Sequence, residues 1–128
     1  MPAQAEKEGR LMKQIAVLGL SRFGASVARS LETMGVEVMG VDSDKEKVAD
    51  LAHDITHVVQ RQIQPAGLRN FDVVVLSVKD VEISCLATMA LKDHGAAKVV
   101  AQASGEAHAK ILERIGADKV IMPEKDIM

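Results

Sequence analysis

The chain has 128 residues and a formal net charge of −2 at pH 7, a length that suits one domain and a charge too small to hold nucleic acid or an anionic membrane. Its 48% hydrophobic and 27% charged residues exclude a disordered chain. Trp and Tyr are absent, so the aromatic side chains on which single-stranded nucleic acids stack are scarce. No apolar run reaches the roughly 18–20 residues that a membrane-spanning helix needs.

The first segment of the chain, residues 1–12, is charged and lacks the apolar stretch of a signal peptide. We expect it to be a disordered leader, followed by one folded domain over residues 13–128. The single cysteine, Cys85, allows no disulfide within the chain and suits a reducing compartment. Its position in a helical pattern favours a buried apolar role over a reactive thiol.

Short β-branched segments alternate with helical patterns along the whole domain, which predicts repeated βαβ units and a parallel sheet. Several of these segments are apolar at every position, as expected of strands that helices cover on both faces. The fold class is therefore α/β, a doubly wound parallel sheet of the Rossmann type. The predicted strands are Ile15–Leu18, Glu37–Val41, His57–Val59, Val73–Leu76, Val99–Ala101 and Val120–Ile121.

Four helices are predicted from apolar residues at helical spacing. The first should bury Phe23, Val27, Leu31 and Met34, and the second, which a capping box of Ser43 and Glu46 would start, Val48, Leu51 and Ala52. The third should bury Ile83, Leu86, Ala87, Ala90 and Leu91, and the fourth Ala107, Ile111, Leu112 and Ile115. The histidines His53, His57 and His108 are too scattered for a metal site, so we expect them on the surface or on helix faces.

The connection between the third and fourth strands is short. It has about eleven residues, including Pro65 and Gly67, whereas a parallel crossover takes a dozen or more and usually contains a helix. In a 3-2-1-4-5 strand order it also passes over two strands. We therefore expect its helix to be reduced or missing.

The strongest motif is Gly19-Leu20-Ser21-Arg22-Phe23-Gly24, which follows the first strand and opens the first helix. A G-x-G-x-x-G motif in this context binds dinucleotides: the first glycine makes the turn, the third lets helix and strand pack closely, and backbone N–H groups hold the phosphates. Asp42 ends the second strand, where a carboxylate accepts hydrogen bonds from ribose hydroxyls. Ser21 occupies the middle position, where a Cβ is expected to intrude on the pyrophosphate unless its hydroxyl compensates as a donor.

Other residues border the same end of the predicted sheet. Arg22 at the helix start opposes the helix dipole, which favours a phosphate contact over a stabilising role. Ser77 and Lys79 follow the fourth strand and would border the nucleotide across the switch point. The alternatives are a tight βα turn without ligand for the glycines and solvated charges for Asp42, Arg22 and Lys79. The full set of expected cofactor-binding residues is Gly19, Ser21, Arg22, Phe23, Gly24, Asp42, Ser43, Ser77 and Lys79.

The segment Ile15-Ala-Val-Leu-Gly-Leu-Ser-Arg-Phe-Gly24 resembles the opening of the RCK or KTN (TrkA-N type) domain of Trk/Ktr potassium-uptake regulators. Further similar stretches are Leu68-Arg-Asn-Phe-Asp72, the Ile-Gly-Ala-Asp sequence of residues 115–118, and Pro123-Glu-Lys-Asp126. The resemblance implies a cytoplasmic regulatory subunit, peripheral to the membrane, that binds ATP, ADP or NAD(H). It also implies homodimers assembled into an octameric ring that gates a membrane potassium transporter or channel, and a divalent cation near Glu124.

The sequence departs from this family at Ser21, where the family has glycine, and at Gln60-Arg-Gln-Ile-Gln-Pro65, where the family has an acidic stretch that helps to hold adenosine. These departures keep open a second interpretation, a degenerate Rossmann scaffold that mediates subunit assembly without nucleotide. An NAD-dependent oxidoreductase is a third and more distant one, because the chain offers no acid–base set beside a substrate pocket. We therefore expect a binding protein and not an enzyme.

Overall fold

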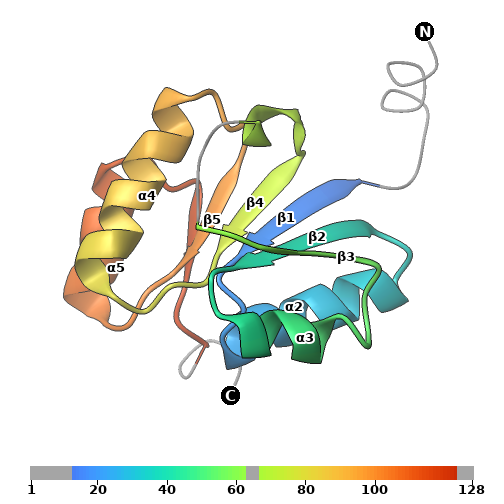
Figure 1. Ribbon diagram of the computed structural model, residues 1–128. Helices are drawn as coiled ribbons and strands as arrows, with labels where there is room; N and C mark the ends of the chain where they lie inside the picture. The colour runs from blue at the N-terminus through green and yellow to red at the C-terminus, as the bar shows by residue number, and fades with distance from the viewer. Residues whose placement is uncertain (1–12, 63–66, 124–128) are drawn as a thin grey trace, which may run out of the picture.

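The computed structural model describes residues 13–62 and 67–123, which form a six-stranded parallel sheet with helices on both faces (Figure 1). The strands are β1 (Gln14–Leu18), β2 (Glu37–Asp42), β3 (His57–Gln60), β4 (Val73–Leu76), β5 (Val99–Gln102) and β6 (Lys119–Ile121). The helices are α2 (Arg22–Thr33), α3 (Lys45–Leu51), the 3-10 turn η1 (Leu68–Asn70), α4 (Val81–Asp93) and α5 (Glu106–Arg114). The strand order β3-β2-β1-β4-β5-β6 confirms the predicted doubly wound Rossmann-type sheet.

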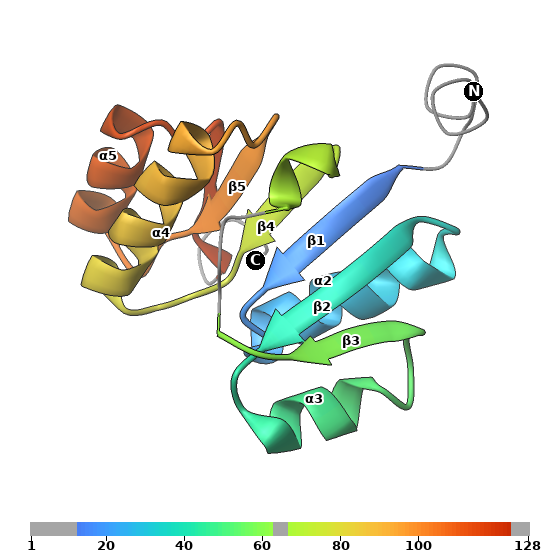
Figure 2. The same ribbon diagram turned by 45° about the horizontal axis from the view of Figure 1, so that its top comes forward.

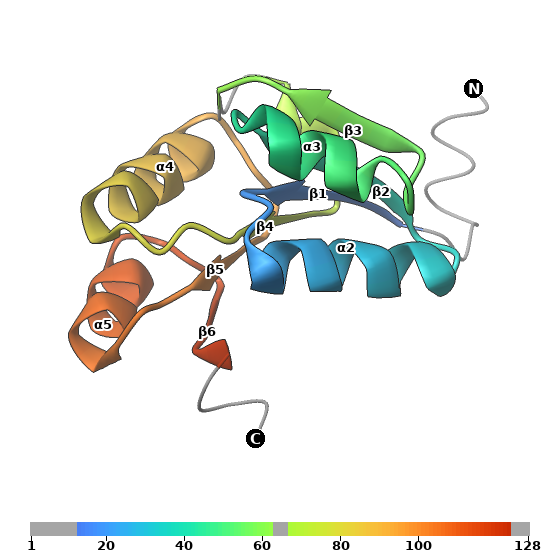
Figure 3. The ribbon, with the colours of Figure 1, turned by 60° about the horizontal axis from the view of Figure 1, so that its bottom comes forward.

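Two clusters of buried side chains hold the layers together. One unites α2 and α3 with β1 and β2 and contains Ala28 and Leu51. The other unites α4 and α5 with β4 and β5 and contains Leu91 and Leu112. Figures 2 and 3 show α4 and α5 beside each other, at the end of the sheet away from α2 and α3. The loop from β1 to α2 and the loop from β4 to α4 therefore both start at the boundary between the neighbouring strands β1 and β4, where the strand order reverses.

The first two helices differ from the prediction at their ends. Met34 is 73% exposed: α2 ends at Thr33, and Met34 is its C-cap residue. Ser43 is not the cap of α3: Asp44 is, and its carboxylate accepts from the backbone N–H groups of Glu46 and Lys47. The Asp42 carboxylate accepts from the Asp44 N–H at 2.8 Å. The chain bends at Ser43, between the two residues that this bond joins, and α3 begins after Asp44.

The predicted buried faces of α4 and α5 are only partly right. Leu91 and Leu112 are buried, and Ala87 and Ile115 pack against the core, but other predicted residues face the solvent. Ile83 and Leu86 are 55% and 59% exposed, and Ala107 and Ile111 are also exposed. The residues that face the sheet are Ser84, Thr88 and Leu91 on α4 and His108, Ala109 and Leu112 on α5. Polar side chains take these buried positions because they bond one another, so hydrophobicity alone does not mark the face.

His108, expected on the surface or on a helix face, lies on α5 but is buried, with only 3% exposed. Its Nδ1 accepts from the Ser104 N–H at 3.0 Å, and its Nε2 lies 3.0 Å from the Ser84 hydroxyl. Because Nδ1 must accept, the ring is neutral in this arrangement, with Nε2 able to donate to Ser84. The imidazole thus joins α4 to α5 as a structural group.

The domain should lose stability below neutral pH through His108. Burial lowers the pKa of His108, and the negative charge of Asp80 opposes this only in part. The unfolded chain, with a pKa of about 6.5, therefore takes up the proton first, and the free energy of unfolding falls by up to about 1.4 kcal/mol per pH unit from there down to the folded pKa. Urea unfolding between pH 7 and 5 measures this slope. His108→Asn should flatten it, whereas the same change at exposed His53 should leave it intact.

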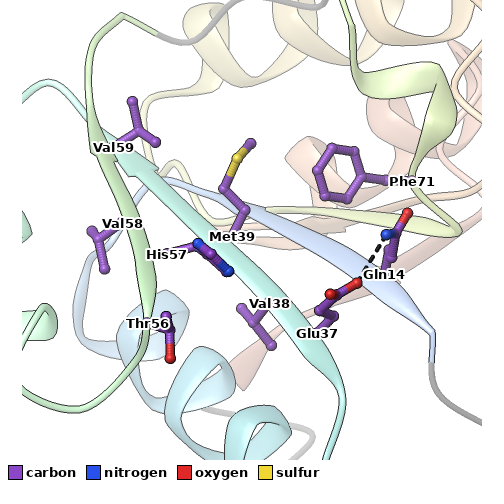
Figure 4. Close-up of a pocket in the computed structure, with 9 residues that line it drawn as sticks. All are labelled: Gln14, Glu37, Val38, Met39, Thr56, His57, Val58, Val59 and Phe71. Carbon is purple, nitrogen blue, oxygen red and sulfur yellow. Dashed lines mark hydrogen bonds between the residues drawn. The ribbon is translucent and has the colours of Figure 1, made fainter.

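In the described residues, the connection between β3 and β4 agrees with the prediction that its crossover helix is reduced or missing. Of its described residues only Leu68–Asn70 are helical, in a 3-10 turn. Met39, Val59 and Phe71 therefore lie in a groove of about 400 Å³ on the sheet face (Figure 4). Gln14 Nε2 donates to Glu37 Oε1 at 2.8 Å at one end of this groove. The groove lies toward the amino ends of the strands and is separate from the glycine loop.

Candidate nucleotide-binding site

The loop between β1 and α2 needs glycine at two positions. Gly19 has φ +90°, and a Cβ on it would overlap the backbone carbonyl of Ser77. A Cβ on Gly24 would overlap the carbonyl oxygen of Gly19 and meet the Ser77 side chain. The tight turn and the close helix–strand packing predicted for these glycines are both present. The loop consequently lies directly against the end of β4.

The first turn of α2 presents backbone N–H groups that have no acceptor within the helix. Ser21 is the N-cap residue, with an extended backbone, but its side chain makes no capping bond. The first turn contains no acidic side chain, and the exposed Arg22 is its first residue. Such a terminus favours an anion supplied from outside the chain.

Asp42 connects the two loops at this end of the sheet. One carboxylate oxygen accepts from the Leu20 N–H at 2.7 Å and the other from the Asp44 N–H at 2.8 Å. A carboxylate has about four lone-pair sites, so each oxygen can still accept from a ribose hydroxyl. Asp42 thus fixes the glycine loop and remains available to a ligand.

Ser77 lies buried beneath the loop and joins three strands. Its N–H donates to the Leu18 carbonyl at 2.8 Å, and its Oγ donates to Gln102 Oε1 at 2.7 Å. Ser21 Oγ lies 2.7 Å from Ser77 Oγ. Gln102 was not among the predicted site residues. Its place at the carboxyl end of β5, in line with Ser77 at the end of β4, was the available indication.

Two cavities open beside the loop and share Lys79. One, of about 460 Å³, is lined by Gly19, Ser21, Asp42, Ser43, Lys47, Gln62, Ser77, Val78, Lys79 and Ile83. The other, of about 380 Å³, is lined by Arg22, Phe23, Lys79, Gln102, Ala103, Ser104, Met122 and Pro123. The fold thus brings eight of the nine predicted binding residues to the two cavities, with Gly24 packed under the loop. All lie at the carboxyl ends of the strands, at the β1/β4 switch point where such sheets bind ligands.

The remaining site prediction, a cation near Glu124, falls outside the described residues. Within residues 13–62 and 67–123 no cluster of three His, Cys, Asp or Glu side chains is placed to hold a metal ion. None of the helices in that part of the chain is both long and apolar enough to cross a bilayer. The charged side chains that line the two cavities are Asp42 and the cations Arg22, Lys47 and Lys79.

A parallel sheet with this strand order, a glycine loop after β1 and an acidic residue, Asp42, at the end of β2 defines a Rossmann-type domain. Residues 15–123 match the TrkA-N domain family. The chain belongs to this family, as its resemblance to the RCK or KTN domain predicted.

Two curated relatives come from Bacillus subtilis (strain 168). The Ktr system potassium uptake protein A is 39% identical over 122 residues, covering 90% of this chain and 55% of that protein. The Ktr system potassium uptake protein C is 37% identical over 124 residues, covering 91% of this chain and 56% of that protein. The chain thus spans about half the length of these relatives.

Solved structures show the same fold at low sequence identity. The TrkA-N domain of inner membrane protein ybaL from Escherichia coli superposes with a TM-score of 0.79 at 15% identity, covering 92% of this chain and 93% of that one. The GsuK RCK domain superposes with a TM-score of 0.72 at 24% identity, covering 85% and 25%. A structure of the GsuK channel bound to NAD gives a TM-score of 0.72 at 13% identity, covering 88% and 22%.

Proposed function

We propose that this domain binds an adenine nucleotide, ATP, ADP or NAD(H), and acts as the ligand-sensing part of a potassium uptake system. The observation that carries the proposal is the convergence of the glycine loop, the α2 N-terminus and Asp42 on one cavity. The names of the Bacillus relatives support the role in potassium uptake. The NAD-bound GsuK channel supports the class of ligand.

Each part of the nucleotide has a fitting partner. The amides of the α2 N-terminus would bind phosphate oxygens, and Arg22 and Lys79 would neutralise their charge. Asp42 would accept from the ribose hydroxyls, with the base in the cavity beside Ser43. The second cavity, which Lys79 shares, would take the further phosphates of ATP or the second half of a dinucleotide. Binding across the switch point would bridge the two halves of the sheet, which is how a ligand can bias conformation.

The rest of the proposal concerns assembly. We propose a membrane potassium transporter or channel as the partner, a homodimer that builds a ring, a place at the cytoplasmic face of the membrane, and a divalent cation near Glu124. A regulatory role agrees with the relatives' names and with the side chains that line the two cavities, which offer cations and hydrogen-bonding groups. The competing interpretation is a scaffold without nucleotide, which Ser21 in place of the middle glycine favours.

Calorimetric titration with ADP, ATP, NADH and NADPH tests the proposal. NADPH should bind at least about tenfold more weakly than NADH, because the Asp42 carboxylate accepts from two hydroxyls but repels a 2′-phosphate. Asp42→Asn should bring the affinities for NADPH and NADH closer together, because it removes the charge that repels the 2′-phosphate. Its amide oxygen can still accept from the Leu20 N–H. Asp54→Ala, at an exposed ion pair with Arg29, is the control that should leave the ratio unchanged. Absence of binding for all four nucleotides would establish the scaffold interpretation instead.

A further inference from the structure

The hydroxyl of Ser21 is not free to donate in the arrangement described. Ser77 Oγ carries one hydrogen, and Gln102 Oε1 accepts it at 2.7 Å. Ser21 Oγ, 2.7 Å from Ser77 Oγ, must then donate to Ser77, because each hydroxyl has only one hydrogen. A phosphate oxygen that approached Ser21 would meet lone pairs. The direction of these two hydrogen bonds therefore opposes phosphate binding at the loop.

The amide of Gln102 is poorly satisfied in the same arrangement. Gln102 is buried, with 4% of the residue exposed, and it lines the cavity that contains Arg22 and Lys79. Its Oε1 is engaged by Ser77, while its Nε2 has no hydrogen bond to another residue in the described part of the chain. A buried donor without an acceptor is destabilising, because it has lost its hydrogen bond to water and gained none in the protein. The amide therefore has a physical reason to change its orientation when a ligand arrives.

We propose that Ser21, Ser77 and Gln102 form a hydrogen-bond relay whose direction a bound phosphate reverses, so that Gln102 is a positioning residue for phosphate at the glycine loop. The inference rests on the proposed nucleotide binding. Rotation of the amide by half a turn places Nε2 against Ser77 Oγ as a donor. Ser77 then donates to Ser21, and Ser21 donates to the phosphate oxygen. Oε1 turns toward the cavity of Arg22 and Lys79, whose cations can donate to it.

Two substitutions of Gln102 separate the relay from simple packing. At pH 8 the ionised side chain of Gln102→Glu offers only acceptors. Ser77 must then donate to it, and Ser21 must donate to Ser77 instead of to a phosphate. Gln102→Met has a similar length and no polar hydrogen, so Ser77 is free to donate to Ser21. ADP should bind about tenfold more weakly to Gln102→Glu and within about threefold of the native affinity to Gln102→Met. Adenosine, which has no phosphate, should bind both variants like the native protein.

A double-mutant cycle removes the direct charge effect of the new carboxylate. In a Ser21→Gly background Gln102→Glu should weaken ADP binding by less than about threefold, because no hydroxyl remains at position 21 to be oriented. The side-chain amide signals of Gln102 in ¹⁵N NMR spectra should also shift on addition of ADP and not of adenosine. Circular dichroism checks that every variant is folded.

The outcomes are distinct. Native protein that binds ADP, with equal effects of Gln102→Glu in both backgrounds, would overturn the relay and leave the proposed function standing. An equal loss in Gln102→Met and Gln102→Glu would reduce Gln102 to a packing role and would likewise overturn it. Native protein that binds neither ADP nor NADH would overturn the proposed function and the relay together.

Discussion

Replacing Gly24 by alanine is expected to lower the free energy of unfolding by about 2 kcal/mol and to abolish nucleotide binding. A Cβ at this position would overlap the carbonyl oxygen of Gly19 and press on the Ser77 side chain. Backbone cannot move aside as the end of a flexible side chain can, so the loop or the helix must shift, at a typical cost of about 1–3 kcal/mol. The helix propensity of alanine returns at most about 1 kcal/mol. The displaced loop would no longer present its amides to a phosphate.

Urea unfolding of Gly24→Ala measures the loss, and Ser26→Ala is the matched control. Ser26 lies on the same helix and is exposed, so the added helix propensity is not opposed by a contact, and the change should stay within about 0.5 kcal/mol. A Gly24→Ala protein as stable as the native one would show that α2 can move away from β4 at little cost. The close packing of the loop would then not be the reason for glycine at this position.

The sheet could be predicted from the sequence because its central strands, β1, β4 and β5, are buried on both faces. Segments such as Val73–Leu76 are apolar at every position and match β4 residue for residue. Glycine and aspartate at the strand ends then placed the turns. The short connection after β3 was also predictable, since its length alone excludes a full crossover helix.

The helix faces of the second half could not be predicted in the same way. Ser84 and His108 are buried because they bond each other across α4 and α5 at 3.0 Å, and Thr88 is buried because its hydroxyl donates to the Ser84 carbonyl. Pattern analysis assigns such residues to the solvent. The partner that satisfies each of them lies on another element or another turn, which a hydrophobic periodicity does not record.

The residues of the candidate site also fall into those that a local sequence pattern predicts and those that a long-range contact places. Gly19, Gly24 and Asp42 belong to a local motif in which spacing carries the geometry, and the structure brings them together. Gln102 belongs to no such motif. Its contact with Ser77 exists only because β4 and β5 are neighbours and end level with each other. The group to which the Ser21 hydroxyl donates depends on that contact, so it could not be predicted from the sequence.

Ser21→Gly is expected to bind ADP about tenfold more tightly than the native chain, or about 1.4 kcal/mol. The Cβ of Ser21 lies in the loop that must approach the phosphates, and its Oγ is held against Ser77 at 2.7 Å, so the side chain has little freedom to move aside. A hydrogen bond from the Ser21 hydroxyl to the phosphate offsets this obstruction only in part, because the hydrogen bonds among Ser21, Ser77 and Gln102 must first reverse their direction.

The same substitution, Ser21→Gly, should lower the free energy of unfolding. The glycine variant loses the bond to Ser77, worth about 1 kcal/mol, but no helix cap, because the Ser21 side chain caps nothing. Ser21→Ala separates the two contributions to binding, since it keeps the Cβ and removes the donor. It should bind ADP more weakly than the native chain. If calorimetry instead found the alanine variant as tight as the glycine variant, the Cβ would not be the obstacle, and the hydroxyl alone would account for the weaker native affinity.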